Sequence, residues 1–281
     1  MQTRPAEDHN QVGADQPVEL GGSRDDAFIR FADVSKWYGE KASRLHAVDN
    51  VSFEAKRGEF ISVLGPSGCG KSTMVMLTSG LEKLTSGSIE IAGLPVIKPY
   101  TDLGIVFQQD LLMEWRSVLR NVLVQPEFRG FNVREYDGAA RKLLALVGLE
   151  QFADRYPHEL SGGMRQRVSI CRALIHDPDV LLMDEPFGAL DAITRDQLNL
   201  DLQRIWQEHK KTVLFVTHSI AEAIFLGDRV FVMGPRPTKI VEDIKIDLPR
   251  PRKLEIRETP EFLAYVHRIT AIFMRMGILK S

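Results

Sequence analysis

The chain has 281 residues, of which 44% are hydrophobic and 26% are charged, as in ordinary soluble globular proteins of one large or two small domains. Its formal net charge of −2 argues against a nucleic acid as the main partner, because nucleic-acid-binding domains are usually strongly basic. Two cysteines are too few for a disulfide framework and favour a reducing compartment. The sequence contains no run of about 18 apolar residues, so it predicts no membrane span. The polar N-terminus has no signal segment, so we expect the protein to stay where it is made.

The chain begins with a segment, residues 1–26, that is rich in Gln, Asp, Gly and Pro. It has too few apolar side chains to offset the entropy lost on folding, so we expect a disordered tail. Strands are predicted where apolar residues alternate or cluster, at 28–31, 45–53 and 60–64. The last of these strands follows a turn at 56–59 and leads into a short apolar helix.

Further strands and helices follow a predicted turn at 85–88. The remaining predicted strands are 89–93, 103–107, 180–185, 212–216 and 229–233. Apolar residues recur at helical spacing through an insertion at 111–156 and in helices at 161–175, 193–208 and 220–226. Strands that alternate with helices indicate an α/β fold with a largely parallel sheet.

The stretch after the strand at 60–64 matches the phosphate-binding pattern G-x-x-x-x-G-K-[ST] at every fixed position. It reads Gly65-Pro66-Ser67-Gly68-Cys69-Gly70-Lys71-Ser72-Thr73. Its glycines allow the backbone to wrap an anion, and the N–H groups of the loop and first helical turn then point at the phosphates. Lys71 adds a positive charge for the β- and γ-phosphates, and Ser72 offers a hydroxyl to Mg²⁺. The alternative is a chance glycine turn with a solvated lysine.

Two acids end the apolar strand at 180–185. Asp184 is predicted to hold Mg²⁺, directly or through water, and Glu185 to polarise the attacking water from one residue further out. The alternative is a pair of solvated acids at a strand end.

A third motif, Leu160-Ser161-Gly162-Gly163-Met164-Arg165-Gln166, opens a helix. A serine and two glycines at a helix N-terminus form a second anion-binding site. Taken alone, the motif also fits a plain helix N-cap. Together with the phosphate loop and the acidic strand end, in this order, it resembles the signature sequence of ATP-binding cassette (ABC) ATPases.

The resemblance covers most of the chain and implies a P-loop NTPase of the ABC ATPase fold. That fold has a RecA-like core with a largely parallel sheet, an antiparallel β subdomain and a helical insertion subdomain, here at about 111–175. The cassette would occupy 27–248, with a C-terminal extension at 249–281. The resemblance implies an enzyme that binds ATP and Mg²⁺ and hydrolyses ATP to ADP and phosphate. Two copies would form a homodimer in which Ser161, Gly162 and Gly163 of each chain cap the other chain's ATP.

Four more residues take roles that the resemblance implies. Tyr38 is similar to the aromatic residue that stacks on adenine, and Gln108 to the glutamine that contacts Mg²⁺ or the lytic water. Asp191 lies in a stretch similar to the D-loop, which crosses to the partner subunit. His218 is similar to the switch histidine, a hydrogen-bond partner of the γ-phosphate. The alternatives for Tyr38 and His218 are purely structural roles.

Several stretches, at 107–110, 183–192 and 247–252, resemble the ATPase subunits of importers for nitrate, taurine and alkanesulfonates. Such a subunit is peripheral, on the cytoplasmic face of the inner membrane. It works with two integral-membrane permease subunits and an extracytoplasmic substrate-binding protein. The alternatives are a soluble cassette ATPase that acts on ribosomes or DNA and a cassette of a non-import membrane complex. The long tail and the loop at 234–239 depart from the usual pattern, and we expect neither to touch the ATP site.

The C-terminal stretch, residues 260–280, places apolar side chains at helical spacing and predicts an amphipathic helix. We expect this helix to dock on its own domain; the alternatives are contact with a second subunit or a lipid surface. The basic run at 250–253 is expected to be a solvated linker. Cys69 lies in a loop rich in N–H donors, which favour a thiolate, so we expect it to react with thiol reagents; the alternative is a buried, inert thiol.

Overall fold

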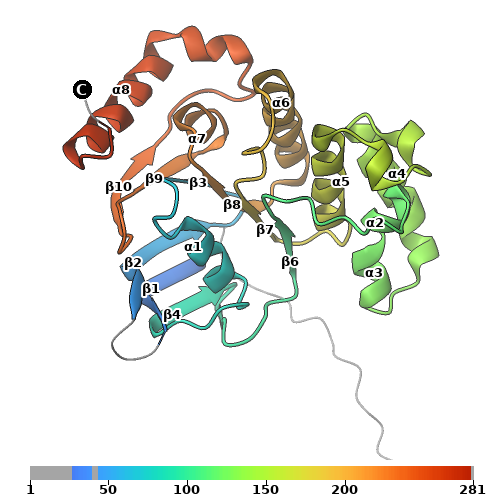
Figure 1. Cartoon of the computed structure of the whole chain (residues 1–281), viewed down its shortest axis with the longest axis horizontal. Helices are drawn as coiled ribbons and strands as arrows, with labels where there is room; N and C mark the ends of the chain where they lie inside the picture. Colours follow the sequence, from blue (N-terminus) through green and yellow to red (C-terminus); the bar gives the residue numbers. More distant parts are fainter. Residues whose placement is uncertain (1–26, 40–43, 280–281) are drawn as a thin grey trace, which may run out of the picture.

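Two β-sheets and the helices around them make up the part of the chain, residues 27–39 and 44–279, that this computed structural model describes (Figure 1). The predicted disordered tail, residues 1–26, lies outside the described residues. The smaller sheet is antiparallel, in the order β2-β1-β4-β5. Its strands are β1 (Ala27–Tyr38), β2 (Leu45–Lys56), β4 (Ser86–Ile91) and β5 (Leu94–Pro95).

The larger sheet has the order β10-β9-β3-β8-β7-β6. Its strands are β3 (Phe60–Leu64), β6 (Leu103–Val106), β7 (Val180–Asp184), β8 (Thr212–Thr217), β9 (Arg229–Met233) and β10 (Ile240–Lys245). All neighbours pair in parallel except β9 and β10. Every residue of β3 and β8 is buried, because both faces of the sheet are covered, and this explains their continuous apolar runs. The predicted α/β fold with a largely parallel sheet is confirmed.

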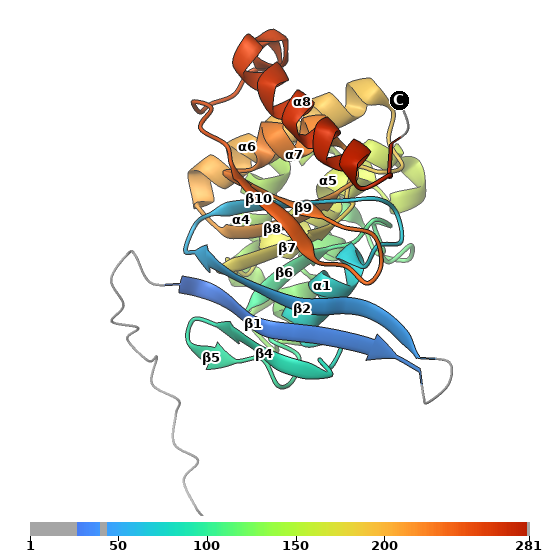
Figure 2. The same cartoon turned by 90° about the vertical axis from the view of Figure 1, so that its left-hand side faces the viewer.

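The helices cover the two faces of the larger sheet unequally. They are α1 (Lys71–Thr78), α2 (Val118–Val122), α3 (Val124–Phe128), α4 (Val133–Leu146), α5 (Gly162–Leu174), α6 (Ala192–His209), α7 (Ile220–Leu226) and α8 (Pro260–Arg275). The helix α1 shares a core with the smaller sheet and one face of the larger sheet, whereas α2 and α4 to α8 share a second core. Figure 2 shows the smaller sheet as a separate layer, with α6, α7 and α8 on the far side of the larger sheet. In Figure 1, α2 to α5 gather beside β6, at the opposite end of the molecule from α8.

The predicted and observed elements agree best in the buried strands. The predicted strands at 60–64 and 229–233 and the predicted helix at 220–226 have the bounds of β3, β9 and α7. The predicted turn at 85–88 is wrong, because β4 already runs through this stretch, paired with β1. The chain turns later, at the Ala92-Gly93 pair, where φ is 52° and 74°.

The edge strand β10 is an element that the sequence patterns do not indicate. Its sequence mixes acids and a lysine with apolar residues, and only Ile244 of the strand is buried. A half-solvated strand normally shows apolar alternation, but a register shift between Ile240 and Glu242 interrupts it here, so the pairing of β10 with β9 comes from the tertiary structure.

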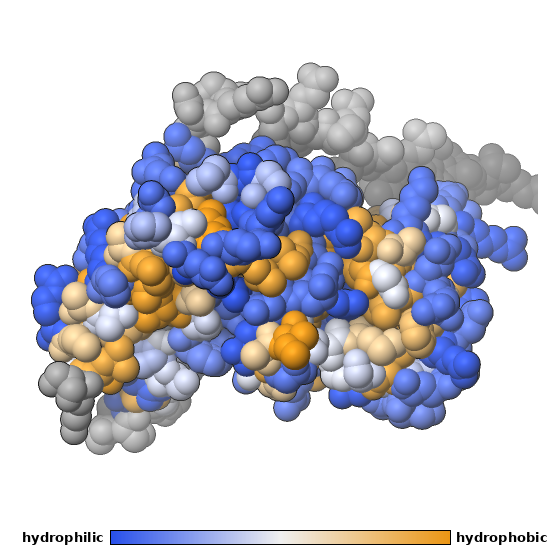
Figure 3. Space-filling model, turned by 90° about the horizontal axis from the view of Figure 1, so that it is seen from above, coloured by the Kyte–Doolittle hydropathy of each residue, from blue (hydrophilic) through white to orange (hydrophobic). Residues whose placement is uncertain are grey.

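The C-terminal helix α8 docks on its own domain, as expected. Its buried face carries four apolar side chains that join the core of α6 and α7: Phe262, Ile269, Ile272 and Phe273. Thr259 caps the helix by accepting a hydrogen bond from the N–H of Phe262. Figure 3, which views the face that carries α8, shows apolar patches separated by hydrophilic side chains.

The basic run at 250–253 is not a solvated linker, and this expectation is wrong. Arg252 is 2% exposed, and its Nη1 donates to the carbonyl oxygens of Ile224, Phe225 and Gly227 at 2.7, 3.0 and 2.8 Å. These carbonyls lie at the C-terminal end of α7, where helix carbonyls have no partners of their own and carry partial negative charge. Burial lowers the pKa of Arg252 to about 10, so the side chain remains a cation at neutral pH. The run therefore clamps the helix that follows His218.

Replacing Arg252 with Met is expected to lower the free energy of unfolding by about 2–4 kcal/mol, because buried carbonyls of α7 lose their donor. Urea unfolding, followed by circular dichroism, measures this change. Arg268→Met is the matched control: Arg268 is paired with Glu242 on the surface, and its loss should cost under about 0.5 kcal/mol. Equal stability of the two variants would contradict the clamp.

Candidate functional site

Four predicted site segments follow the carboxyl ends of neighbouring strands in the larger sheet. The order β3-β8-β7-β6 places the phosphate loop after β3, His218 after β8, Asp184 and Glu185 at the end of β7, and Gln108 after β6. Parallel strands present their carboxyl ends at one edge of a sheet, where open α/β sheets bind ligands. The topology therefore gathers residues that are far apart in the sequence.

The phosphate loop, residues 65–73, has the backbone geometry of an anion cradle. Gly68 and Gly70 have φ values of 74° and 125°, which side chains with a Cβ rarely adopt. A Cβ at Gly70 would also lie 2.9 Å from the carbonyl oxygen of Ala47. Lys71 is buried, and its Nζ donates to two carbonyl oxygens of the loop at 3.0 Å. The helix α1 begins without a side-chain N-cap, which leaves the N–H groups of its first turn for an anion.

Ser72 and Asp184 lie side by side although 112 residues separate them. The Ser72 hydroxyl donates to Asp184 Oδ1 at 3.0 Å. Burial raises the pKa of Asp184, and the hydrogen bond from Ser72 opposes this shift. A hydroxyl and one carboxylate fit Mg²⁺, which usually takes one or two protein oxygens and completes its shell with phosphates and water. The described residues contain no cluster of three or more His, Cys, Asp or Glu side chains that could hold a metal ion, so phosphates or water would have to supply the other ligands.

Glu185 stands between Lys71 and His218. Its Oε1 lies 3.2 Å from Lys71 Nζ, and its Oε2 lies 2.9 Å from His218 Nδ1. Burial alone would raise the pKa of Glu185, but the hydrogen bond with His218 and the charge of Lys71 outweigh it, so the net pKa is lowered. The carboxylate is therefore ionised at neutral pH, as a general base must be. Its φ of 44° is left-handed, an uncommon conformation for a residue with a side chain.

Gln108 reaches the same region. A Cβ built on Gly188 would lie 3.4 Å from Gln108 Nε2 and 3.7 Å from Glu185 Oε2, so the glutamine side chain lies beside the acid. The segment at 107–111 that carries Gln108 is tied to α5: Gln166 Nε2 donates to the carbonyl of Phe107 at 3.2 Å. Arg165 and Arg172 of α5 also bind this segment, at Asp110 and at the carbonyls of Asp110 and Leu111. A displacement of α5 would therefore be felt at Gln108.

The signature residues are not brought to the phosphate loop. Ser161 caps α5 by accepting from the N–H of Met164 at 3.3 Å. No hydrogen bond or ion pair within residues 27–39 and 44–279 joins Ser161, Gly162 or Gly163 to the loop at 65–73. In Figure 1, α5 lies with α2 to α4 beyond β6, away from α1.

The predicted D-loop lies beside the signature instead. A Cβ at Gly162 would lie 3.5 Å from Leu190 Cδ2, and one at Gly163 would lie 2.4 Å from Thr194 Cγ2. Gly163 therefore allows α5 and α6 to approach closely. Asp191 is exposed and caps α6, with its Oδ1 3.0 Å from the N–H of Thr194. Ser161 and Gly162 of the signature thus lie next to the D-loop, whereas Gly163 is buried between α5 and α6.

Tyr38 ends β1 above the first turn of α1. Its hydroxyl lies 3.5 Å from Thr73 Oγ1, and Lys36 Nζ lies 4.6 Å from the centre of its ring. The ring is half-buried, which is compatible with stacking on a base next to the phosphate loop.

The loop at 234–239 touches the phosphate loop, contrary to our expectation. Arg236 Nη2 donates to the carbonyl oxygen of Gly68, and a Cβ at Gly70 would lie 3.1 Å from Thr238 Cγ2. Arg236 is thus a site residue that sequence reasoning missed. The signal was its place after β9, which pairs directly with β3, but strand order is not evident from the chain alone.

Cys69 is 2% exposed, so the structure supports an inert thiol in place of the reactive thiol we expected. Cys171 is also free and buried, and burial raises the pKa of its thiol to about 12. We expect a bulky maleimide to leave both thiols of the native protein unlabelled and to label both after denaturation, as read by mass spectrometry. Ala264→Cys, on the exposed side of α8, is the positive control. Rapid modification of native Cys69 would contradict the burial argument.

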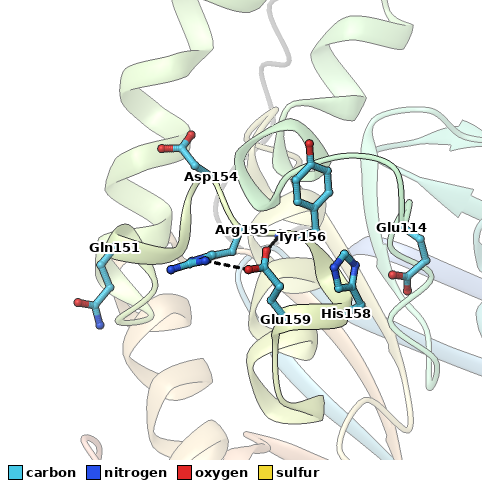
Figure 4. A pocket seen from close by; sticks show the side chains of 7 residues that line it. All are labelled: Glu114, Gln151, Asp154, Arg155, Tyr156, His158 and Glu159. Atoms are coloured by element: carbon cyan, nitrogen blue, oxygen red, sulfur yellow. Dashed lines mark hydrogen bonds and ion pairs between the residues drawn. The ribbon is translucent and has the colours of Figure 1, made fainter.

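Two cavities lie in or beside the helical insertion. The first, of about 690 Å³, is lined by polar side chains, and none of the predicted site residues is among them (Figure 4). In it Arg155 pairs with Glu159 at 2.8 Å. The second is an apolar groove of about 700 Å³ whose wall includes Ile105, Phe107, Leu111 and Phe128. This groove therefore flanks the segment that carries Gln108.

Known proteins are similar to this chain in sequence and in fold. The sequence profile described as ABC transporter matches residues 48–188. The taurine import ATP-binding protein TauB of Rhizobium johnstonii is 46% identical over 84% of this chain and 92% of its own. The aliphatic sulfonates import ATP-binding protein SsuB of Bacillus cereus is 38% identical over 88% of this chain and 96% of its own. A bacterial ABC transporter cassette solved as a dimer has a TM-score of 0.69 and 33% identity, over 79% of this chain and 100% of that one.

Proposed function

Because the chain belongs to the ABC transporter family, we propose that it is the ATP-hydrolysing subunit of an importer for taurine, another aliphatic sulfonate or a related small anion. The names of its relatives support the substrate class. The observation that carries the ATPase part is the row of groups at adjacent strand ends, with Lys71 and His218 on either side of Glu185. A phosphate cradle and an ionised base in contact are what hydrolysis of a nucleoside triphosphate needs.

We assign the chemistry as follows. The backbone of the phosphate loop and Lys71 bind the phosphates, and Tyr38 stacks on the adenine. Ser72 and Asp184, with Gln108, hold Mg²⁺, which neutralises charge on the β- and γ-phosphates when bound. The Glu185 carboxylate takes the proton of the attacking water, and His218 holds that carboxylate through Nδ1 and contacts the γ-phosphate.

The site needs a second copy of the chain. Ser161, Gly162 and Gly163 make no hydrogen bond or ion pair with the phosphate loop within the described residues, Ser161 and Asp191 are exposed, and Gly162 lies against Leu190, the neighbour of Asp191. We infer a homodimer in which the surface around Ser161, Gly162 and Asp191 closes the ATP site of the partner, and the dimeric state of the similar cassette supports it. A homodimer about a two-fold axis gives two equivalent sites.

The permease contact is assigned to the apolar groove. Phe128 and Leu111 at its wall are 69% and 53% exposed, and exposed large apolar side chains gathered in one groove mark an interaction surface. An apolar helix of a permease subunit seated there would press on the segment at 107–111. That segment carries Gln108 and is held to α5, so the contact would reach both the ATP site and the signature.

The place of the subunit follows from its partners. Within the described residues, no helix combines the length and apolarity needed to cross a bilayer. We propose that the subunit lies on the cytoplasmic face of the membrane, held there by two permease subunits, and that an extracytoplasmic binding protein delivers the anion.

Reconstitution tests this function. The chain is assembled in liposomes with its permease subunits, and ATP hydrolysis is measured as taurine-loaded binding protein is added. We expect the taurine-loaded binding protein to stimulate ATP hydrolysis, and we expect no stimulation when sulfate replaces taurine. Phe128→Asp should abolish assembly with the permease subunits. Phe131→Asp changes a second residue of the same groove and should have the same effect. ATP hydrolysis without assembly or substrate response would favour a soluble cassette ATPase, and assembly without substrate response would favour a non-import membrane complex.

A further inference from the structure

One buried carboxylate next to the ATP site has no role in the chemistry above. Glu222 lies in the first turn of α7 and is 5% exposed. Its Oε2 accepts a hydrogen bond from the Thr217 hydroxyl at 2.5 Å, and Thr217 directly precedes His218. Thr217 is itself 2% exposed and is the last residue of β8, so this bond restrains the chain directly before His218.

The other oxygen of Glu222 faces a different loop. Glu222 Oε1 lies 3.4 Å from Arg195 Nε on α6. Arg195 Nη2 in turn donates to the carbonyl oxygen of Leu190 at 2.8 Å, and Leu190 directly precedes Asp191. One carboxylate therefore joins the segment at 188–191 to the segment that carries His218.

The pair is a poor device for stability alone. Burial raises the pKa of the Glu222 carboxyl, although the Thr217 hydrogen bond and the Arg195 charge oppose the shift. Burying the Glu222 carboxylate costs desolvation energy that its attraction to the partly exposed Arg195 offsets only partly, and apolar side chains of similar size are often as stable. What the pair does provide is a fixed geometry between two loops, because Arg195 is anchored at the carbonyl oxygen of Leu190 and Glu222 at the Thr217 hydroxyl.

We propose that Glu222 is a positioning residue that aims His218 at Glu185 and, through Arg195, makes that aim depend on the position of the segment at 188–191. This inference rests on the proposed function. Asp191 lies on the surface that we assign to the partner chain. Seating of the partner would shift Leu190, and Arg195 and Glu222 would carry the shift to His218. Each site would then hydrolyse ATP only when the partner is in place.

The proposal is tested by a double-mutant cycle on ATP hydrolysis, with full-length chains in the permease complex. Glu222→Gln keeps an acceptor for the Thr217 hydroxyl but loses the charge that faces Arg195. Arg195→Gln loses the hydrogen bond to the carbonyl oxygen of Leu190. We expect each variant to lower kcat about tenfold, since small misplacements of catalytic groups have effects of this order and larger. The KM for ATP should change less than about twofold, because neither side chain contacts the nucleotide.

The combined variant should be no slower than the slower single variant, because both changes break one connection. Additive losses would overturn the proposal. The matched control is Arg204→Gln: Arg204 is also on α6, pairs with Asp201 at 3.4 Å and binds the carbonyl of Leu146, but touches neither loop. An equal loss of kcat in this control would show a general effect of weakening α6 and would also overturn the proposal.

A second readout separates positioning from folding. In the wild type, the rate should rise steeply with ATP concentration, because two seated chains are needed; in Glu222→Gln and Arg195→Gln the Hill coefficient should fall toward one. Unchanged cooperativity would contradict a link to the partner. Both readouts use ATP hydrolysis alone, so they remain informative if taurine proves not to be the imported anion. Failure of the importer assignment is therefore seen separately, as a missing response to the binding protein.

Discussion

Glu185→Gln is expected to bind ATP as the wild type does and to hydrolyse it about 10²–10⁴ times more slowly. The amide preserves the shape of the side chain and an acceptor for His218, but it cannot take a proton from water. The phosphate cradle, with Lys71 and the N–H groups of α1, is unchanged. Single-turnover hydrolysis in the assembled complex measures the rate, and fluorescence of a labelled nucleotide measures the affinity.

The contrasting variant is Lys71→Ala. Lys71 is buried and contributes a charge-assisted contact to the phosphates, so its loss should weaken ATP binding itself by about 10- to 100-fold. The two variants thus separate binding from chemistry. Near-wild-type turnover of Glu185→Gln would remove Glu185 from the role of base, and tight ATP binding by Lys71→Ala would count against the phosphate cradle.

The sequence predicts those parts of the site that depend on the local chain. The phosphate loop is one continuous stretch between a buried strand and a helix, and the strand at 60–64 is observed with the same bounds as β3. Asp184 and Glu185 follow an apolar strand directly. Ser72 and Asp184 were each predicted to bind Mg²⁺, and they meet across 112 residues because parallel strands present their carboxyl ends at one edge of the sheet.

The sequence does not predict contacts that depend on strand order and burial. Arg236 and Arg252 stand in polar, proline-containing stretches of the sequence, which are typical of solvated loops. Nevertheless, Arg236 binds the phosphate loop and Arg252 is 2% exposed. Arg252 is buried where carbonyls of α7 and of the segment after β10 converge, and these segments come together only in the folded chain. The same holds for Glu222, since nothing in the chain indicates that it will meet Arg195.

The exposed signature leads to the prediction that the working site is shared between two chains. In one chain, the phosphate loop supplies donors on one side of ATP, while Ser161 is exposed and Gly162 lies beside Leu190, with no hydrogen bond from either to that loop within the described residues. A lone chain would leave the γ-phosphate facing water, a poor setting for preorganised electrostatic stabilisation. Two chains related by a two-fold axis bring the second donor cluster to each site.

Mixing two inactive variants tests this directly. Lys71→Ala removes the phosphate contact of one chain, and Ser161→Arg blocks the donor cluster of the other; each homodimer then has two damaged sites. In the mixed dimer, one composite site carries both lesions and the other carries none. Random pairing gives equal numbers of mixed dimers and homodimers, so about a quarter of the wild-type ATPase activity should return if the two sites act independently.

A mixed dimer that is verified by mass spectrometry and still inactive has two physical explanations. Either each site lies within one chain, or both sites must be intact for either to work. ATP-dependent dimerisation of Glu185→Gln, measured by light scattering, separates them, because a shared site makes the unhydrolysed nucleotide part of the dimer contact. A Glu185→Gln chain that remains monomeric at saturating ATP would exclude the shared site, whereas a stable dimer together with an inactive mixture would show that the two shared sites act only as a pair.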